Sequence, residues 1–119
     1  MERRPKVFVV ILNYNGKDVL KKCLTSVFKN DYSNFEIVLV DNNSTDGSFE
    51  SARADFSKAY FVKNNENLGF SAGNNIGIRF ALERTADYVL LLNSDVEVER
   101  DFLSNLLAVA EKDEKIGIL

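Results

Sequence analysis

Three apolar stretches of this chain each end in a run of carboxylate, amide and hydroxyl side chains. These polar runs begin at Asn13, Asp41 and Asn93. In a parallel sheet the carboxyl ends of neighbouring strands lie at one edge, and that edge is where such sheets bind ligands. If the apolar stretches are parallel strands, the three polar runs meet there. The sequence therefore predicts one polar, acidic pocket for a small molecule.

The second polar run offers a carboxylate at the end of an apolar strand. Burying such a group is unfavourable unless it accepts hydrogen bonds. Two interpretations of Asp41 are equally supported by the spacing: it accepts the N–H of a pyrimidine, or it caps backbone amides of the turn that follows. Tyr14, between Asn13 and Asn15, either stacks on a flat base or packs on the rim of the sheet. Asp46, before Gly47, is more typical of a turn and a helix N-cap.

The third polar run contains Asp95, a candidate ligand for a divalent cation. Mg²⁺ and Mn²⁺ prefer oxygen ligands and keep several waters. They commonly complete their coordination with phosphate oxygens and neutralise charge on a leaving group. Glu97 and Glu99, further on, are more typical of a solvated surface.

The composition excludes several kinds of chemistry. The chain has no histidine, which rules out Ser-His-Asp and Cys-His catalysis and zinc held by imidazole. Its single cysteine, Cys23, cannot form an intrachain disulfide and is predicted to be a small core residue. The net charge of −3 disfavours nucleic acid as the partner. No apolar run approaches the ~20 residues of a membrane span. Without an apolar signal segment, the expected location is the cytoplasm.

The hydrophobic pattern predicts an α/β fold in one domain, residues 1–119. Val-, Ile- and Leu-rich strands alternate with amphipathic helices, which is typical of stacked βαβ units. The predicted strands are 7–12, 37–40, 60–62 and 88–92, and 116–119 begins another strand. The predicted helices are one from about 17 to the turn cluster at 30–34, then 48–56, 71–84 and one from about 101. The inner face of the first helix is Leu20, Cys23, Leu24, Val27 and Phe28, and Lys17, Asp18, Lys21 and Lys22 cover its other side. Continuous apolar strands indicate burial on both faces, hence a three-layer sandwich with a mostly parallel open sheet. Right-handed crossovers favour the strand order 3-2-1-4.

Two helices carry more specific predictions. In 71–84, Ile76, Phe80 and Ala81 face inward, and the small residues Ala72, Gly73 and Gly77 indicate a close approach to a neighbouring strand or a ligand. In the helix from about 101, the predicted buried stripe is Leu103, Leu106, Leu107 and Ala110.

Three other binding folds do not match. A dinucleotide site needs a glycine-rich turn after the first strand, whereas this turn has only Gly16. Gly16–Lys17–Asp18 lacks the Ser or Thr of a Walker phosphate loop. A phospho-acceptor domain needs an acidic pair where this chain has Asn13 and Asn15.

Four segments together resemble the nucleotide-sugar-binding half of a family 2 glycosyltransferase of the GT-A, Rossmann-like fold. They are 9–16, 40–48, 65–77 and 91–95, and the resemblance runs from Val7 to Leu119. The third segment is most similar to the rhamnosyltransferase-like branch. The resemblance implies transfer of a sugar from a nucleoside diphosphate donor, UDP- or TDP-linked rather than GDP-linked, to an acceptor hydroxyl.

The resemblance also implies roles for individual residues. Asp41 would accept from the pyrimidine, Tyr14 would lie against the base, and the backbone near Asn13 would line the nucleoside. Asn93 would hydrogen-bond the ribose, and Asp95 is the last carboxylate of the family's Asp-x-Asp motif, holding Mg²⁺ or Mn²⁺ with one charge fewer because Asn93 replaces the first aspartate. The predicted donor site comprises Asn13, Tyr14, Asn15, Asp41, Asn43, Asn67, Gly69, Ser71, Asn75, Asn93, Ser94 and Asp95, with Asn67, Gly69, Ser71 and Asn75 beside the ribose and diphosphate.

The chain departs from the family pattern after Asp95. Family members continue into a half that binds the acceptor and holds the general base that inverting transfer needs. No residue after Asp95 matches that base, so we predict no catalytic residue and expect a truncated, donor-binding part. The acceptor, a glycan or a lipid-linked one, stays open, and attachment at the inner membrane face is a further expectation. The alternative is a non-catalytic nucleotide-binding or assembly module, forming a homodimer through its C-terminal edge strand.

Overall fold

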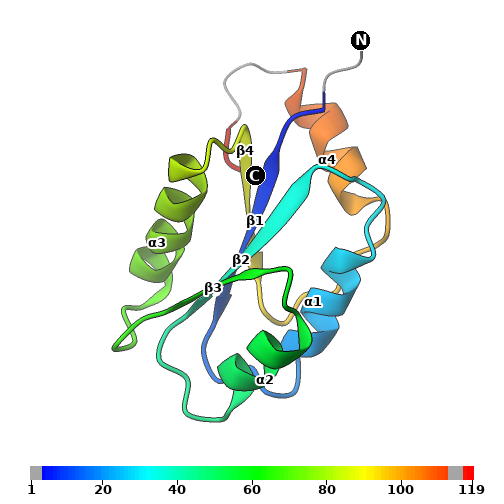
Figure 1. The fold of residues 1–119 in the computed structure, drawn as a ribbon. Helices are drawn as coiled ribbons and strands as arrows, with labels where there is room; N and C mark the ends of the chain where they lie inside the picture. Colours follow the sequence, from blue (N-terminus) through cyan, green and yellow to red (C-terminus); the bar gives the residue numbers. More distant parts are fainter. Residues whose placement is uncertain (1–3, 113–116) are drawn as a thin grey trace.

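The computed structural model describes residues 4–112 and 117–119, in which strands and helices alternate (Figure 1). The elements are β1 (Val7–Asn13), α1 (Leu20–Phe28), β2 (Phe35–Asp41), α2 (Ser48–Asp55), β3 (Tyr60–Lys63), α3 (Phe70–Glu83), β4 (Tyr88–Asn93) and α4 (Phe102–Ala110). The strands predicted at 7–12, 37–40, 60–62 and 88–92 and the four predicted helices are present, with bounds within two residues of the prediction at most ends. The exception is the start of α1, where residues 17–19 form a turn and the helix begins at Leu20. The four strands form one parallel sheet in the order β3-β2-β1-β4, as predicted.

The strand register brings the polar runs together. Asn13, the last residue of β1, pairs with Asp41, the last residue of β2. On the other side of β1, Leu12 pairs with Asn93 at the end of β4. Because all three strands run in the same direction, the loops that follow them leave the sheet at one edge. This confirms the predicted meeting of the three runs.

The sheet lies between two helical layers, which confirms the three-layer sandwich. Figure 1 shows α1, α2 and α4 on one face and α3 on the other. Successive side chains of a strand point to opposite faces. On β1, Val7, Val9 and Ile11 pack in the core beneath α1, α2 and α4, whereas Phe8 and Val10 pack beneath α3. Burial on both faces explains why β1 is apolar without alternation.

Helix α3 lies unusually close to the sheet. A Cβ atom on Gly77 would overlap Cγ1 of Val10, and one on Gly73 would stand 2.7 Å from Cδ1 of Leu12. Gly73 and Gly77 therefore allow close packing against β1, as predicted, whereas Ala72, predicted with them, is exposed. Ala81 is buried in the same layer, with Ile76 and Phe80 half-buried against it, as predicted.

The buried stripe of α4 is narrower than predicted. Leu103, Leu107 and Ala110 are buried, but Leu106 is 38% exposed. Positions 103, 107 and 110 follow one line along the helix, and Leu106 lies on the flank of that line, towards solvent.

The last described residues extend the sheet beside β4. The amide of Val89 donates to the Gly117 carbonyl at 2.9 Å, and the amide of Leu91 donates to the Leu119 carbonyl at 3.1 Å. A parallel bridge joins Val89 and Ile118. Residues 117–119 therefore lie along β4 as a single bridge with flanking backbone hydrogen bonds, while Ile116, the first residue of the strand predicted there, lies outside the described residues. Among the described residues, no helix has the length and apolar character needed to cross a membrane.

Candidate functional site

Four buried polar side chains lie together at the carboxyl ends of β1 and β2. They are Asn13, Asp41, Ser44 and Ser48, called here the strand-end cluster. Asn13 Nδ2 lies 2.9 Å from Asp41 Oδ1, 2.9 Å from Ser48 Oγ and 3.3 Å from Ser44 Oγ. Asp41 also accepts the Ser44 hydroxyl at Oδ1 (2.7 Å) and the Ser44 amide at Oδ2 (2.8 Å). These donors compensate for burying a carboxylate with no exposed surface.

Asp41 therefore accepts a backbone amide of the turn that follows it, which is one of the two roles predicted for it. Its Oδ1 accepts two hydrogen bonds and its Oδ2 accepts one. Recognition of a base by the same carboxylate stays a prediction.

The loop after β1 passes close to the strand-end cluster at Gly16. A Cβ atom there would overlap Asn13 Oδ1 and would lie 3.3 Å from Ser94 Oγ. Within the described part of the chain, Asn13 Oδ1 is the buried side-chain oxygen that has no hydrogen-bond partner. Only glycine fits here, which gives Gly16 a structural role that sequence reasoning did not assign to it.

The loops after β1 and β2 are fastened to each other. The amide of Asn15 donates to Ser44 Oγ at 2.8 Å, and Asn15 Oδ1 accepts the amide of Thr45 at 2.8 Å. Asn15 and Asn43 both adopt positive φ, 52° and 65°, a conformation that asparagine tolerates better than most residues. Tyr14 projects from this fastened loop with 53% of its surface exposed. Its ring is therefore available for stacking, which favours that interpretation over packing on the rim.

Asp46 organises the start of α2 from the position before the N-cap, and not as the N-cap that was predicted. The N-cap residue is Gly47, with φ 82°. Asp46 Oδ1 accepts the Ser48 amide at 3.0 Å and the Ser48 hydroxyl at 2.5 Å, while Oδ2 accepts the Lys17 amide at 3.0 Å. Desolvation acts to raise the pKa of the Asp46 carboxyl, but these hydrogen bonds outweigh it and hold the pKa below its ordinary value.

Asn42 connects a third loop to this edge. Its Nδ2 donates to the Gly69 carbonyl at 3.1 Å, and its Oδ1 accepts Asn64 Nδ2 at 2.9 Å. Gly69 has φ 84°, and its amide donates to Asn67 Oδ1 at 2.9 Å. The segment that leads into α3 is thereby held over the end of β2. Asn67, Gly69, Ser71 and Asn75 are exposed on this side of the edge.

Sequence reasoning missed four polar residues that hold these loops in place. They are Asn42, Ser44, Ser48 and Asn64, all buried or nearly so. The available signal was their position: each lies in or beside a polar run that directly follows a strand. What the sequence does not reveal is that these side chains bond to neighbouring loops rather than to solvent.

The end of β4 is more open. Asn93 and Asp95 are exposed, and Ser94 is half-buried. Beneath them, the Cys23 thiol donates to the Asn93 carbonyl at 3.6 Å. Burial raises the pKa of the Cys23 thiol to about 11, and the negative charge of Asp95 adds to this effect. Cys23 is thus a protonated core residue, as predicted.

The end of β4 offers a divalent cation one carboxylate ligand. In residues 4–112 and 117–119, no three acidic, histidine or cysteine side chains converge to hold an ion by themselves. Asp95 supplies an exposed carboxylate, and Asn93 a neutral amide. Mg²⁺ is commonly held by one or two carboxylates together with substrate phosphates and water. The donors therefore fit a cation that a diphosphate helps to bind.

The model of glycosyl transferase family 2 matches residues 8–119. The chain belongs to this family.

Several curated glycosyltransferases are similar to the chain. It is 33% identical to glycosyltransferase GlyA of Streptococcus pneumoniae serotype 4 over 85% of this chain and 14% of GlyA. It is 34% identical to GlyG of the same organism over 94% of this chain and 38% of GlyG. It is 28% identical to the dTDP-rhamnosyl transferase RfbF of Shigella flexneri over 84% of this chain and 33% of RfbF. The chain thus spans well under half the length of these glycosyltransferases.

Solved structures of glycosyltransferases have the same GT-A fold. The mannosyltransferase PcManGT of Pyrobaculum calidifontis, in complex with GDP-Man and Mn²⁺, is 27% identical with a TM-score of 0.79, covering 88% of this chain and 32% of PcManGT. TarS 1-349 of S. aureus, in complex with UDP, is 24% identical with a TM-score of 0.79, covering 90% of this chain and 32% of that one. The predicted fold class is confirmed.

Proposed function

We propose that this chain is the donor-binding part of a glycosyltransferase, which holds a nucleoside diphosphate sugar for transfer to an acceptor hydroxyl. The observation that carries the proposal is the edge at which β1, β2 and β4 end. Three polar runs meet there, and the loops after β1, β2 and β3 are fastened to one another by buried side chains. Most of this edge is therefore ordered before a ligand binds, which lowers the free-energy cost of binding.

The loops after β1 and β2 are proposed to bind the base. The exposed Tyr14 ring would stack on it, a contact worth about 1–3 kcal/mol per base. Asp41 Oδ2 accepts one hydrogen bond, from the Ser44 amide, and retains capacity for the N–H of a pyrimidine. Because Asp41 has no exposed surface, this contact requires the Ser44 segment to shift when the base enters. A preference for UDP- or TDP-linked sugars over GDP-linked ones is part of this proposal.

The other two sides of the edge are proposed to bind the ribose and diphosphate. Asn67, Gly69, Ser71 and Asn75 line the side next to α3. On the β4 side, Asp95 would hold Mg²⁺ or Mn²⁺ together with diphosphate oxygens, and Asn93 would hydrogen-bond the ribose. When bound, the cation supplies positive charge that stabilises the leaving diphosphate. The proposal covers donor binding, and we assign no catalytic base among the described residues.

Isothermal titration calorimetry tests the proposal. The folded chain is titrated with UDP, TDP and GDP, each with and without Mn²⁺. We expect UDP and TDP to bind more tightly than GDP, and Mn²⁺ to strengthen binding through the diphosphate. Tyr14→Ala should weaken UDP binding by about 1–3 kcal/mol, whereas Tyr14→Phe, which keeps the ring, should bind as the parent does. Absence of heat with all three nucleotides in a folded sample would overturn the proposal.

A second candidate is assembly of two copies through the strand at 117–119. It is favoured by Ile118, which is 55% exposed beside β4, on a segment that bonds to β4 through its backbone. Exposed strand edges are surfaces to which another strand can pair. Sedimentation equilibrium decides: a monomer at high protein concentration would exclude this arrangement. Attachment to the inner membrane face stays a prediction.

A further inference from the structure

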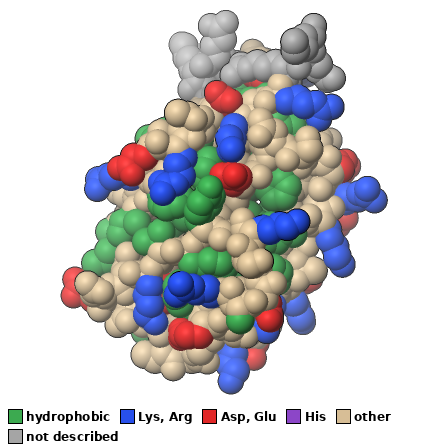
Figure 2. All heavy atoms as spheres, viewed as in Figure 1, with side chains coloured by type: hydrophobic (Ala, Val, Ile, Leu, Met, Phe, Trp, Pro, Cys, Tyr) green, Lys and Arg blue, Asp and Glu red, His purple; other side chains and the backbone are tan. Residues whose placement is uncertain are grey.

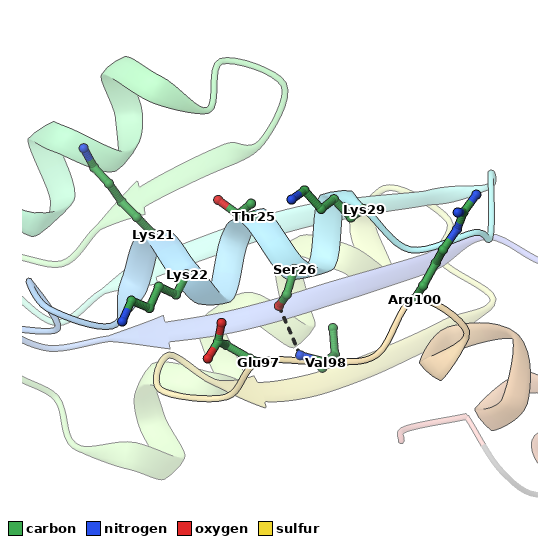
Figure 3. Close-up of a pocket in the computed structure, with 8 residues that line it drawn as sticks. All are labelled: Lys21, Lys22, Thr25, Ser26, Lys29, Glu97, Val98 and Arg100. Carbon is green, nitrogen blue, oxygen red and sulfur yellow. Dashed lines mark hydrogen bonds between the residues drawn. The ribbon is translucent and has the colours of Figure 1, made fainter.

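A groove lined by cations runs along α1, on the face of the sheet opposite α3. One wall is α1 and the other is the segment that follows β4 (Figure 3). The cavity has a volume of about 690 Å³. Its lining residues are Lys21, Lys22, Thr25, Ser26, Lys29, Glu97, Val98 and Arg100. We call it the basic groove.

The charge of the basic groove is opposite to that of the chain. Four cations and a single carboxylate line it, whereas the formal net charge of the chain is −3. The surface shown in Figure 2 instead has Lys and Arg side chains interspersed with Asp and Glu. The positive charge of the basic groove is therefore a local feature, which the negative net charge of the chain does not predict.

Most of this positive charge is not neutralised by neighbouring acids. Lys21 Nζ pairs with Asp55 Oδ2 at 2.5 Å. Within the described residues, no ion pair involves Lys22, Lys29 or Arg100. Lys21 and Lys22 also lie in the first turn of α1, where the helix dipole disfavours cations. A local arrangement that opposes stability is typical of a functional site.

The two walls of the groove are fixed to each other before any ligand binds. Ser26 Oγ accepts the Val98 amide at 3.1 Å (Figure 3). The same hydroxyl donates to the Cys23 carbonyl at 2.8 Å. At the far end, the amide of Asp31 donates to the Arg100 carbonyl at 2.9 Å. The backbone of the groove's Lys and Arg residues is therefore held in place before a ligand binds, which lowers the entropy cost of binding.

We propose that the basic groove binds a compact, phosphate-bearing ligand. Its volume falls within the roughly 300–1,000 Å³ of small-molecule sites. An arginine fork, lysine ammonium groups and the Thr25 hydroxyl are suitable donors for phosphate oxygens. Val98 is the only apolar residue of the lining, so the groove lacks the anchor pockets of a peptide site. The net charge of the chain disfavours nucleic acid.

The basic groove adjoins the end of β4, since Glu97 follows Asp95 by two residues, but its lining differs from the proposed donor site. None of its lining residues belongs to the predicted donor set or to the strand-end cluster. The phosphate group can belong to a soluble compound or to a lipid headgroup, and the experiment below distinguishes these two sources.

The test uses the ¹⁵N-labelled chain and inorganic pyrophosphate in the presence of EDTA, which removes divalent cations. We expect amide resonances of 21–29 and 97–100 to shift in a saturable manner. The double variant Lys22→Gln/Lys29→Gln should raise the dissociation constant at least fivefold. The matched control Lys58→Gln/Lys112→Gln removes the same charge from exposed positions outside the groove and should leave the constant unchanged.

Vesicles identify the source of the phosphate. Co-sedimentation with phosphatidylglycerol vesicles, absent with phosphatidylcholine and lost in Lys22→Gln/Lys29→Gln, would assign a lipid headgroup, with or without binding of pyrophosphate. Pyrophosphate binding without vesicle binding would assign a soluble ligand. The proposal is overturned if neither probe binds, or if both double variants weaken binding equally. It is also overturned if the shifts occur only at 13–15 and 41–48, a result that would leave the donor-site proposal intact.

Discussion

Replacing Asp41 by asparagine tests whether the strand-end cluster holds this edge of the sheet together. Asparagine has the same shape but keeps only one acceptor oxygen. With that oxygen at Oδ1, the new NH₂ group faces the Ser44 amide, which donates at 2.8 Å in the parent. In the opposite orientation it faces Asn13 Nδ2, which lies 2.9 Å from Oδ1. In both orientations two donors meet in a site with no solvent exposure.

The expected loss of stability follows from these contacts. Losing a hydrogen bond to a charged acceptor costs about 1.5–3 kcal/mol, and leaving a buried donor unsatisfied costs about 1–3 kcal/mol more. We therefore expect Asp41→Asn to lower the free energy of unfolding by about 3–5 kcal/mol, on the scale of the 5–15 kcal/mol typical of a whole domain.

Urea unfolding followed by far-ultraviolet circular dichroism measures this loss, since the chain has no tryptophan. The matched control is Asp55→Asn, which removes an exposed carboxylate paired with Lys21. An exposed ion pair contributes about 0–1 kcal/mol, so this control should lose no more than that. If Asp41→Asn loses as little as Asp55→Asn, the carboxylate does not organise the loops and our account of the edge is wrong.

Two further predictions concern the core. The Cys23 thiol has its pKa raised from 9.0 to about 11, so the unfolded chain loses this proton at lower pH than the folded one. The stability contributed by Cys23 is therefore complete below pH 9 and falls by about 2–3 kcal/mol as pH rises to 11, measured as the difference in unfolding free energy between the parent and Cys23→Ala. Gly77→Ala, which in an exposed helix would stabilise, should destabilise by about 1–3 kcal/mol in urea unfolding, because the added methyl overlaps Val10.

A specific result would contradict each of these two predictions. A difference between parent and Cys23→Ala that stays constant from pH 8 to pH 11 would show that the thiol titrates alike in both states. For the helix, Arg79→Ala on the exposed side of α3 should change stability little. If Gly77→Ala is as stable as Arg79→Ala, the close approach of α3 to β1 is not required.

The order of the strands was predictable because few arrangements satisfy the local pattern. Continuous apolar strands demand cover on both faces, and right-handed crossovers then limit where each strand can go. The same reasoning placed Asn13, Asp41 and Asn93 at one edge, because it needs only the ends of the strands. Leu106 shows the limit of reasoning from the hydrophobic pattern. Hydrophobicity predicts that Leu106 is buried, but the position of α4 over the sheet decides which of its leucines faces solvent.

The partners of the polar side chains were not predictable in the same way. Asp41 is followed by serine and asparagine residues that could bond to its carboxylate or to solvent, and the spacing supports both. The choice depends on backbone conformations such as the positive φ of Asn15 and Asn43, which no hydrophobic pattern reports. Asn42 is a similar case, since its partners Asn64 and Gly69 come from another loop. Strand positions follow from periodicity, but loop hydrogen bonds follow from tertiary geometry.

The central place of β1 in the sheet has a consequence for how the chain folds. β1 pairs with β2 on one side. On its other side it pairs with β4, which comes much later in the sequence: Val7 pairs with Tyr88. Pairings between residues so far apart in sequence require large loops to close, and they make folding slow. During synthesis, this edge of β1 therefore stays unpaired until the ribosome has released Asn93. Until then it is an open, apolar strand edge of the kind that aggregates.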